Sequence, residues 1–155
     1  MPSVRVMPAD LSGCRVRVGT LDGFAVAVTE SGELILRMPT RSAEFRRRLK
    51  SWSCVVVPGS LPKVRAIRAH GTRFQLKVWQ ACQRLRPGQT ATSGTLAKSV
   101  GCRSAQAVGT ALGANPLAVL IPCHRVVGAT GVGGFAWGLG RKRRWLKAER
   151  DGLAG

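Results

Sequence analysis

Acidic residues are scarce in this chain. Only 7 Asp and Glu stand against 25 Lys and Arg in 155 residues, which gives a formal charge of +18 at pH 7. Such an excess of positive charge predicts attraction to a polyanion, either a nucleic acid or an acidic membrane surface.

Long apolar runs are missing as well. No run approaches the roughly 20 residues that a membrane-spanning helix needs, although apolar residues make up 45% of the chain and suffice for a core. The N-terminal stretch MPSVRVMPADLSG lacks the continuous apolar segment of a signal peptide. We therefore expect no membrane span and no signal peptide, which leaves surface adsorption as the membrane alternative.

The cysteines show no pairing pattern. They are five in number, at Cys14, Cys54, Cys82, Cys102 and Cys123, and no two of them form a C-x-x-C pair. An odd set without such pairs argues against a disulfide framework and a zinc ribbon, so we expect a reducing compartment: the cytoplasm, or the nucleus in a eukaryote. A zinc site built from Cys14, Cys54 and His70 is a weak alternative, because its spacing matches no compact ligand pattern. We expect no metal.

The first part of the chain has the pattern of strands. Short apolar or alternating runs at residues 14–18, 24–28 and 33–38 are separated by turns rich in Gly and Asp. After them, Phe45 and Leu49 share one face of a short helix that Ser42 can cap. This order predicts a small antiparallel sheet followed by a helix.

Helical spacing dominates the second part. Breakers at residues 57–63 and a basic stretch after them predict a connection, so we place a boundary near Ala69, between an N-terminal structural domain (1–69) and a C-terminal domain (70–155). One apolar stripe of the first helix there contains Phe74, Val78, Cys82 and Leu85. A final helix is expected over residues 141–152. The fold class is therefore α+β.

Two short helices between these elements form a helix-turn-helix candidate. A capped helix at residues 92–101 is joined by the turn 101–103 to a second helix that opens at Ser104. Ala105, Val108 and Leu112 share one face of that helix, which turns Gln106 outward. Combined with the charge of +18, the pair favours binding to DNA.

Cys123 lies in the stretch IPCHRVVG, between Pro122 and His124 and followed by Arg125. A free thiol titrates at about 8.5 and becomes a nucleophile at neutral pH only beside a base or a positive field. His124 can reach it only if the backbone turns here or a water bridges the two groups, because adjacent residues of an extended strand point apart. The alternative is a buried structural cysteine beside a surface His–Arg pair.

IPCHRVVG, preceded by GANP, with FQLKVWQ upstream and GGFAWGLGRKRRWLKAE downstream, resembles the O6-alkylguanine-DNA alkyltransferases over residues 72–152. The resemblance implies a ribonuclease H-like N-terminal sheet and direct DNA repair without a cofactor. A monomer would bind duplex DNA through the minor groove, independent of sequence. It would then rotate an O6-alkylguanine, mainly O6-methylguanine, out of the stack and transfer the alkyl group irreversibly to its own cysteine, once per molecule.

The resemblance also assigns roles to residues. Cys123 would accept the alkyl group, His124 would take the thiol proton through a water, and Glu149 would orient His124. Asn115, the solitary asparagine, would be the hinge that ties the DNA-binding helix to the active-site segment. The substrate pocket would be formed by Leu112, Val126, Phe135, Ala136 and Trp137. The DNA-binding residues would be Ser93, Arg103, Ser104, Ala105, Gln106, Ala107, Gly109 and Arg125.

Three positions depart from the family pattern. Ser93 and Phe135 stand where the family commonly has tyrosine, and Gln106 stands where it has an arginine that fills the gap left by the flipped base. Two other classes of protein remain as alternatives: a damage-recognition protein that binds the lesion without transfer, and a basic transcriptional regulator. The presence of Cys123 argues against the first, and the lack of a dimer element argues against the second.

Overall fold

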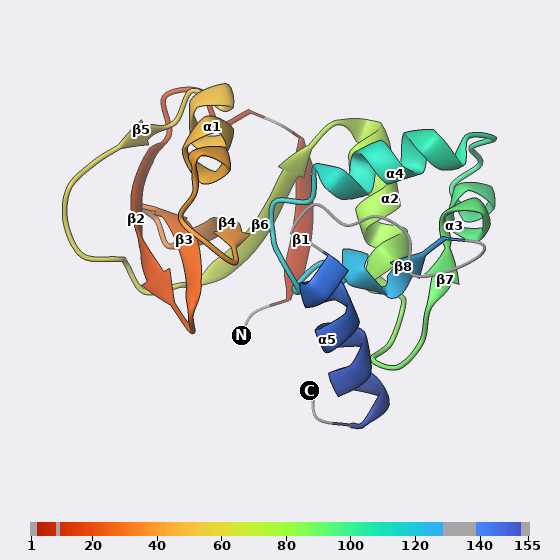
Figure 1. Cartoon of the computed structure of the whole chain (residues 1–155). Coiled ribbons are helices and arrows are strands. Elements are labelled where there is room, and N and C mark those ends of the chain that lie inside the picture. The colour runs from red at the N-terminus through yellow and green to blue at the C-terminus, as the bar shows by residue number, and fades with distance from the viewer. Residues whose placement is uncertain (1–2, 9, 129–138, 153–155) are drawn as a thin grey trace. The chain divides into compact units, whose positions relative to one another are not determined.

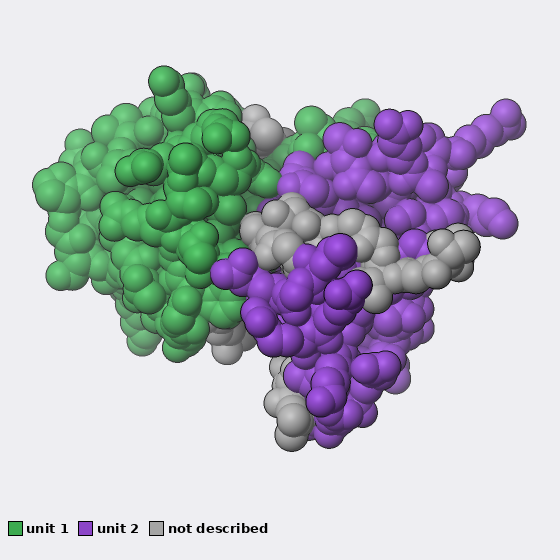
Figure 2. Space-filling model, in the orientation of Figure 1, with its two compact units in different colours: residues 1–76, 116–118 green, residues 77–115, 119–155 purple. Residues whose placement is uncertain are grey.

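The computed structural model describes residues 3–8, 10–128 and 139–152 and divides into two compact units (Figures 1 and 2). Unit 1 consists of Met1–Leu76 and Pro116–Ala118, and unit 2 of Lys77–Asn115 and Val119–Gly155. The boundary expected near Ala69 stays a prediction. None of the described helices is long and apolar enough to cross a membrane.

The described residues of unit 1 form a mixed six-stranded sheet with the order β1-β6-β4-β3-β2-β5. Its strands are β1 (Val4–Pro8), β2 (Arg15–Leu21), β3 (Phe24–Thr29), β4 (Glu33–Met38), β5 (Val55–Val56) and β6 (Ala66–Gly71). The helix α1 (Ala43–Ser51) follows β4 and buries Phe45 and Leu49, as the sequence predicts. The α+β class is confirmed.

The expectation of a purely antiparallel sheet is wrong. The three predicted strands are β2, β3 and β4, and they pair antiparallel, but β6 pairs parallel with β1 and β4, and β5 parallel with β2. Strand β6 lies in the stretch expected to be a connection. Buried Ile67 and Ala69 alternate with the half-exposed Arg68, as in a strand. The basic residues around this short alternation make the stretch look like a connection in the sequence.

The local chemistry of β2 and β3 explains their antiparallel pairing. Asp22 and Gly23, with φ angles of 52° and 82°, form the two-residue turn between them. Positive φ at both positions suits the right-handed twist of a hairpin, and Asp-Gly adopts it readily. The segment Pro116–Ala118 joins the same unit because Arg37 Nη1 donates to Ala118 O (2.8 Å) and the two backbones bond.

Unit 2 carries the remaining helices. Its elements are α2 (Arg73–Gln83, whose first turn belongs to unit 1), β7 (Ala91–Thr92), α3 (Ser93–Ser99), α4 (Ala105–Gly113), the 3₁₀ turn η1 (Cys123–Arg125), β8 (Val126–Val127) and α5 (Leu139–Arg150). The short strands β7 and β8 pair in parallel. In α2, the predicted stripe is buried from Val78 onward, whereas Phe74 is half-buried.

Helices α3 and α4 pack against each other, and both begin at capping residues. Thr92 Oγ1 accepts from Thr95 N (3.1 Å) and Ser104 Oγ from Ala107 N (3.0 Å), which satisfies amides that a helix start leaves without partners. The buried face of α4 consists of Val108 and Ala111. Ala105, the first residue of the helix, is exposed and does not join the buried face.

Candidate active site

The backbone turns sharply at Cys123. Pro122 has φ −80° and ψ 61°, and residues Cys123–Arg125 form a single 3₁₀ turn in which Arg125 N donates to Pro122 O (3.0 Å). Cys123 and His124 are therefore both buried, at 5% and 0% exposure, instead of pointing to opposite faces of a strand. A turn of this kind is one of the two conditions under which His124 can take the proton of the neighbouring thiol.

The thiol receives a hydrogen bond from Asn115. Asn115 lies two residues after the end of α4, and its Nδ2 donates to Cys123 Sγ (3.2 Å) and to Ile121 O (2.8 Å). The second bond links the end of α4 to the segment that precedes Cys123, and the hinge role of Asn115 stays a prediction. The first bond was not foreseen, and it favours the thiolate over the thiol.

Burial nevertheless raises the pKa of Cys123 to about 11, against the lowering effects of Asn115 and of the Lys142 ammonium. At neutral pH only about one thiol in ten thousand would then be ionised. A general base is needed for this thiol to react.

His124, the next residue of the turn, is the base that the sequence predicts. Its Nε2 lies 2.6 Å from Glu149 Oε1, and its ring makes an edge-on contact with Trp145 at 5.6 Å. Burial lowers the pKa of His124, although Glu149 partly opposes the shift, so the ring is neutral at pH 7. With Nε2–H donating to the carboxylate, Nδ1 carries the lone pair, and this buried atom has no hydrogen-bond partner among the described residues.

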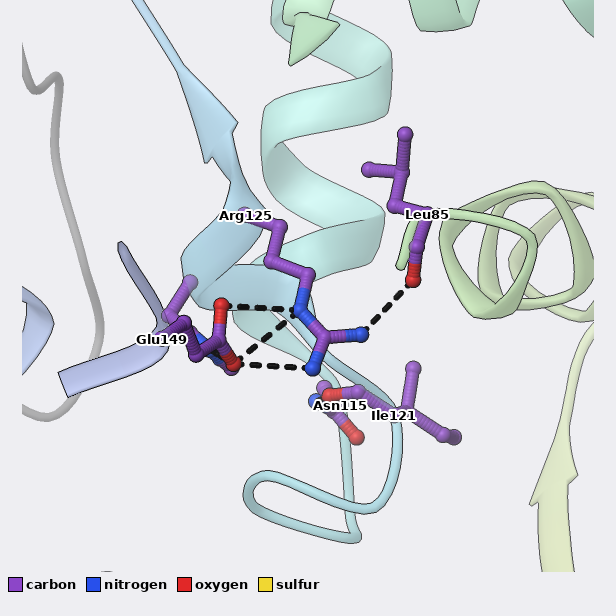
Figure 3. A network of polar contacts seen from close by, with 6 residues as sticks. Leu85, Asn115, Ile121, Arg125 and Glu149 are labelled. Carbon is purple, nitrogen blue, oxygen red and sulfur yellow. Dashed lines mark hydrogen bonds and ion pairs between the residues drawn. The ribbon is translucent and has the colours of Figure 1, made fainter. Parts of the chain in front are cut away.

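Glu149 also binds Arg125 (Figure 3). Arg125 Nε donates to Oε1 (3.1 Å) and Oε2 (3.0 Å) of Glu149, and Nη2 donates to Oε1 (2.8 Å). Burial alone would raise the pKa of Glu149, but the hydrogen bonds from Arg125 and His124 outweigh it, and the pKa is lowered. The carboxylate is therefore charged at neutral pH.

The guanidinium of Arg125, expected among the DNA-binding residues, is directed into the protein. In addition to its bonds to Glu149, its Nη1 donates to Leu85 O (2.6 Å), and only 12% of the side chain is exposed. A phosphate could bind here only if these bonds broke. The structure thus places Arg125 as a support of the Glu149 carboxylate.

Lys142 is a site residue that the sequence interpretation missed. The run RKRR reads as a solvated or phosphate-facing helix start, but Lys142 is 1% exposed and its Nζ donates to Val126 O (2.6 Å). Burial lowers its own pKa, and its ammonium lowers that of Cys123. The spacing of Lys142, Trp145 and Glu149, which puts them on one face of α5, is the signal that could have found it.

The other predicted residues divide by exposure. Arg103, Ser104, Ala105, Gln106 and Gly109 are exposed, and Ser93 and Ala107 are half-buried. All of them lie in α3, in α4 or in the turn before α4. Of the predicted pocket, Val126 is buried and Leu112 half-buried. Phe135, Ala136 and Trp137 lie outside the described residues.

The zinc alternative finds no support among the residues that the structure describes. No group of three or more His, Cys, Asp or Glu side chains there could hold a metal ion. Cys14 and Cys54 are neighbours, since Val55 N donates to Cys14 O (2.8 Å). Burial raises the pKa of both thiols, to about 11 for Cys54, so both are protonated at neutral pH.

The sequence around these residues is similar to that of known proteins. Residues 73–151 match the family model described as "6-O-methylguanine DNA methyltransferase, DNA binding domain". A methylated-DNA–protein-cysteine methyltransferase of Mycolicibacterium paratuberculosis is 45% identical over 82 residues, 52% of this chain and 50% of that protein. Another, from Methanosarcina acetivorans, is 39% identical over 109 residues, 69% of this chain and 63% of that protein.

The crystal structure of Mycobacterium tuberculosis OGT in complex with DNA is also similar. It superimposes with a TM-score of 0.67 and 26% identity, covering 88% of this chain and 93% of that one. In sequence, the chain spans about half the length of the first curated relatives it matches. Because the family model covers more than half of the chain and includes Asn115, Cys123, His124 and Glu149, the chain belongs to the 6-O-methylguanine DNA methyltransferase family.

Proposed function

We propose that this protein repairs DNA directly, by moving the alkyl group of an O6-alkylguanine, mainly O6-methylguanine, onto Cys123. The observation that carries the proposal is the buried Cys123 thiol, which accepts a hydrogen bond from Asn115 and is followed in the same turn by His124, whose ring is bound to Glu149 of α5. The family membership adds the substrate class, since the curated relatives are named for this transfer.

The reaction begins with a proton transfer. The thiol proton of Cys123 passes through a water to Nδ1 of His124, and the Glu149 carboxylate stabilises the imidazolium that forms. The thiolate that is left is stabilised by the hydrogen bond from Asn115 and by the positive charge of Lys142. A Cys123 pKa of about 11 is therefore compatible with reaction at neutral pH, because the thiolate forms only when His124 takes the proton.

A nucleophilic displacement follows. The Sγ electron pair forms a bond to the alkyl carbon, the bond from that carbon to O6 breaks, and its electron pair stays on the guanine, which takes up a proton. The product is a thioether, which no group in this reaction cleaves. Each molecule therefore acts once, and no cofactor is needed.

The base must leave the duplex to reach a buried thiol. We assign DNA binding to α3 and α4 as a helix-turn-helix, with Ser93 and Gln106 at the positions that would contact a phosphate and fill the gap left by the base. A monomer approaching from the minor groove without sequence preference fits a protein that searches for lesions. The ribonuclease H-like class of unit 1 belongs to the same proposal.

Mass spectrometry of the intact protein after mixing with duplex DNA that contains O6-methylguanine tests the proposal. We expect a gain of one methyl group, mapped to Cys123. The variant Cys123→Ala should bind the same DNA and gain none, while Cys14→Ala, in unit 1, serves as the matched control and should gain one. Binding of the lesion without a gain in wild-type mass would favour a damage-recognition protein. A preference for one undamaged sequence would favour a regulator.

A further inference from the structure

A basic hollow lies in unit 2, and none of the residues that line it is among those assigned to DNA binding above. It has a volume of about 470 Å³ and is formed between the segment that links α2 to β7 and the outer face of α5. Figure 1 shows this segment passing beside α5. The lining residues are Gly88, Thr90, Arg143, Leu146, Lys147 and Arg150.

The three cations of this basic hollow lie close together on one face of α5. Arg143, Lys147 and Arg150 are spaced i, i+4 and i+7, and all three are exposed. None of them forms an ion pair or side-chain hydrogen bond with another described residue. Like charges at this spacing repel one another and destabilise a helix.

The helix dipole explains only part of this arrangement. Lys147 and Arg150 lie in the last turn of α5, where a cation is favourable, but Arg143 lies outside that turn and gains nothing from the dipole. No acid lines the hollow among the described residues. Glu149 faces the active site, and its charge is neutralised there by Arg125. The lining of the hollow therefore carries three cations and no acid.

The uncharged residues that line the hollow indicate which kind of anion would bind there. Thr90 offers a hydroxyl donor, and Leu146 adds an apolar surface between the cations. Cations with a hydroxyl suit phosphate oxygens, and the apolar surface suits the sugar between two phosphates. Gly88, with φ +83°, brings the backbone of this segment close to the Glu149 carbonyl, which a side-chain Cβ at this position would approach to 3.7 Å.

We propose that this basic hollow binds the sugar–phosphate backbone of a nucleic-acid strand, as a contact additional to α3 and α4. The choice of DNA as the strand rests on the proposed function. Thr90 precedes Ser93, the first residue of α3, by three residues, so their Cα atoms are at most about 10 Å apart. A strand held by a phosphate contact at Ser93 can thus continue into the hollow within one or two nucleotides.

The test compares two double variants of the full chain that remove the same charge at the same spacing. Arg143→Gln with Lys147→Gln acts in the hollow. Arg46→Gln with Lys50→Gln, on the exposed face of α1, is the control. Binding of a short undamaged duplex is measured by fluorescence anisotropy over a series of salt concentrations.

We expect the variant of the hollow to reduce the slope of log K against log salt by about 1.8, or about 0.9 for each lost phosphate contact, and to weaken binding at moderate salt about tenfold. The control should leave the slope unchanged. Equal slopes for wild type and both variants would overturn the proposal, as would an equal reduction in both variants, which would mean that only net charge matters.

Two further probes distinguish the sources of phosphate. If inorganic tripolyphosphate, or vesicles of acidic phospholipid, bind wild type but not the variant of the hollow while the DNA slope is unchanged, the hollow serves that anion and the proposal is wrong. The proposed function is decided separately by the methyl gain on wild-type Cys123. A gain with unchanged slopes would refute only the basic hollow, and a changed slope without a gain would refute only the transfer.

Discussion

Replacing Glu149 by Gln removes the charge that holds His124 and Arg125 together, with almost no change of volume. In the native site, Oε1 accepts from His124 Nε2 and Arg125 Nη2, while Oε2 accepts from Arg125 Nε. A glutamine amide has one oxygen and one NH₂ group for these two places. If the NH₂ group takes the position of Oε2, it faces the Nε–H group of Arg125, and because both groups are donors no hydrogen bond forms between them. With NH₂ at the Oε1 place, it forces the proton of His124 onto Nδ1, which then cannot act as the base.

Both orientations cost stability and rate. Removing one partner of a buried ion pair costs about 3 kcal/mol, and Glu149 and Arg125 are only 2% and 12% exposed. Losing an oriented general base slows proton transfer by about 100-fold, equivalent to about 2.7 kcal/mol in the barrier. We expect Glu149→Gln to show both effects. Asp151→Asn, the same change at an exposed position just after α5, should show neither.

The assay is single-turnover methyl transfer from duplex DNA containing O6-methylguanine, measured against pH at a temperature where circular dichroism shows the variant folded. Urea unfolding gives the loss of stability. As the pH rises toward about 11, the thiol ionises without help from a base, so the deficit of the variant should shrink. A deficit of the same size at every pH would mean that Glu149 is only structural. A wild-type rate at neutral pH would remove it from the mechanism.

Three further predictions concern the neighbouring residues. Asn115→Ala should raise the pKa of Cys123 further and slow its alkylation by iodoacetamide at neutral pH, as followed by peptide mass mapping; an unchanged pH profile would show that the bond to Sγ has no influence. Because burial lowers the pKa of His124 below its value of about 6.5 in the unfolded chain, the transfer rate should hold through pH 6.5 and fall only at lower pH. Folding stability should decline as the pH drops below about 6.5, since the unfolded chain then binds the proton first; a wild-type rate that falls midway near pH 7 would contradict the assignment. Gln106→Arg should speed repair of duplex DNA, because a longer cation fills the gap of the flipped base better, and should leave transfer from the free modified base unchanged; equal acceleration on both substrates in quenched-flow experiments would show that Gln106 is not at this position.

Features set by neighbours in the chain could be predicted from the sequence. The hairpin of β2 and β3 follows from alternation around Asp22-Gly23, and α3 and α4 follow from their caps at Thr92 and Ser104. A backbone turn at the thiol is one of two alternatives that the sequence leaves open, and the structure has this turn directly after Pro122. Each of these depends on backbone preferences and hydrogen bonds that reach only a few residues.

Contacts between distant segments needed the tertiary structure. A basic stretch becomes strand β6 only because β1 and β4 supply parallel partners on both sides, and no local pattern reports such pairing. Arg125 and Lys142 look like surface cations in the sequence, because the sequence gives the charge of a side chain but not whether it points to solvent or into the protein. The packing of α5 against the 3₁₀ turn decides that Arg125 meets Glu149 and that Lys142 is buried against Val126 O, because a cation enters the interior only where a carboxylate or a carbonyl is already in place to receive it.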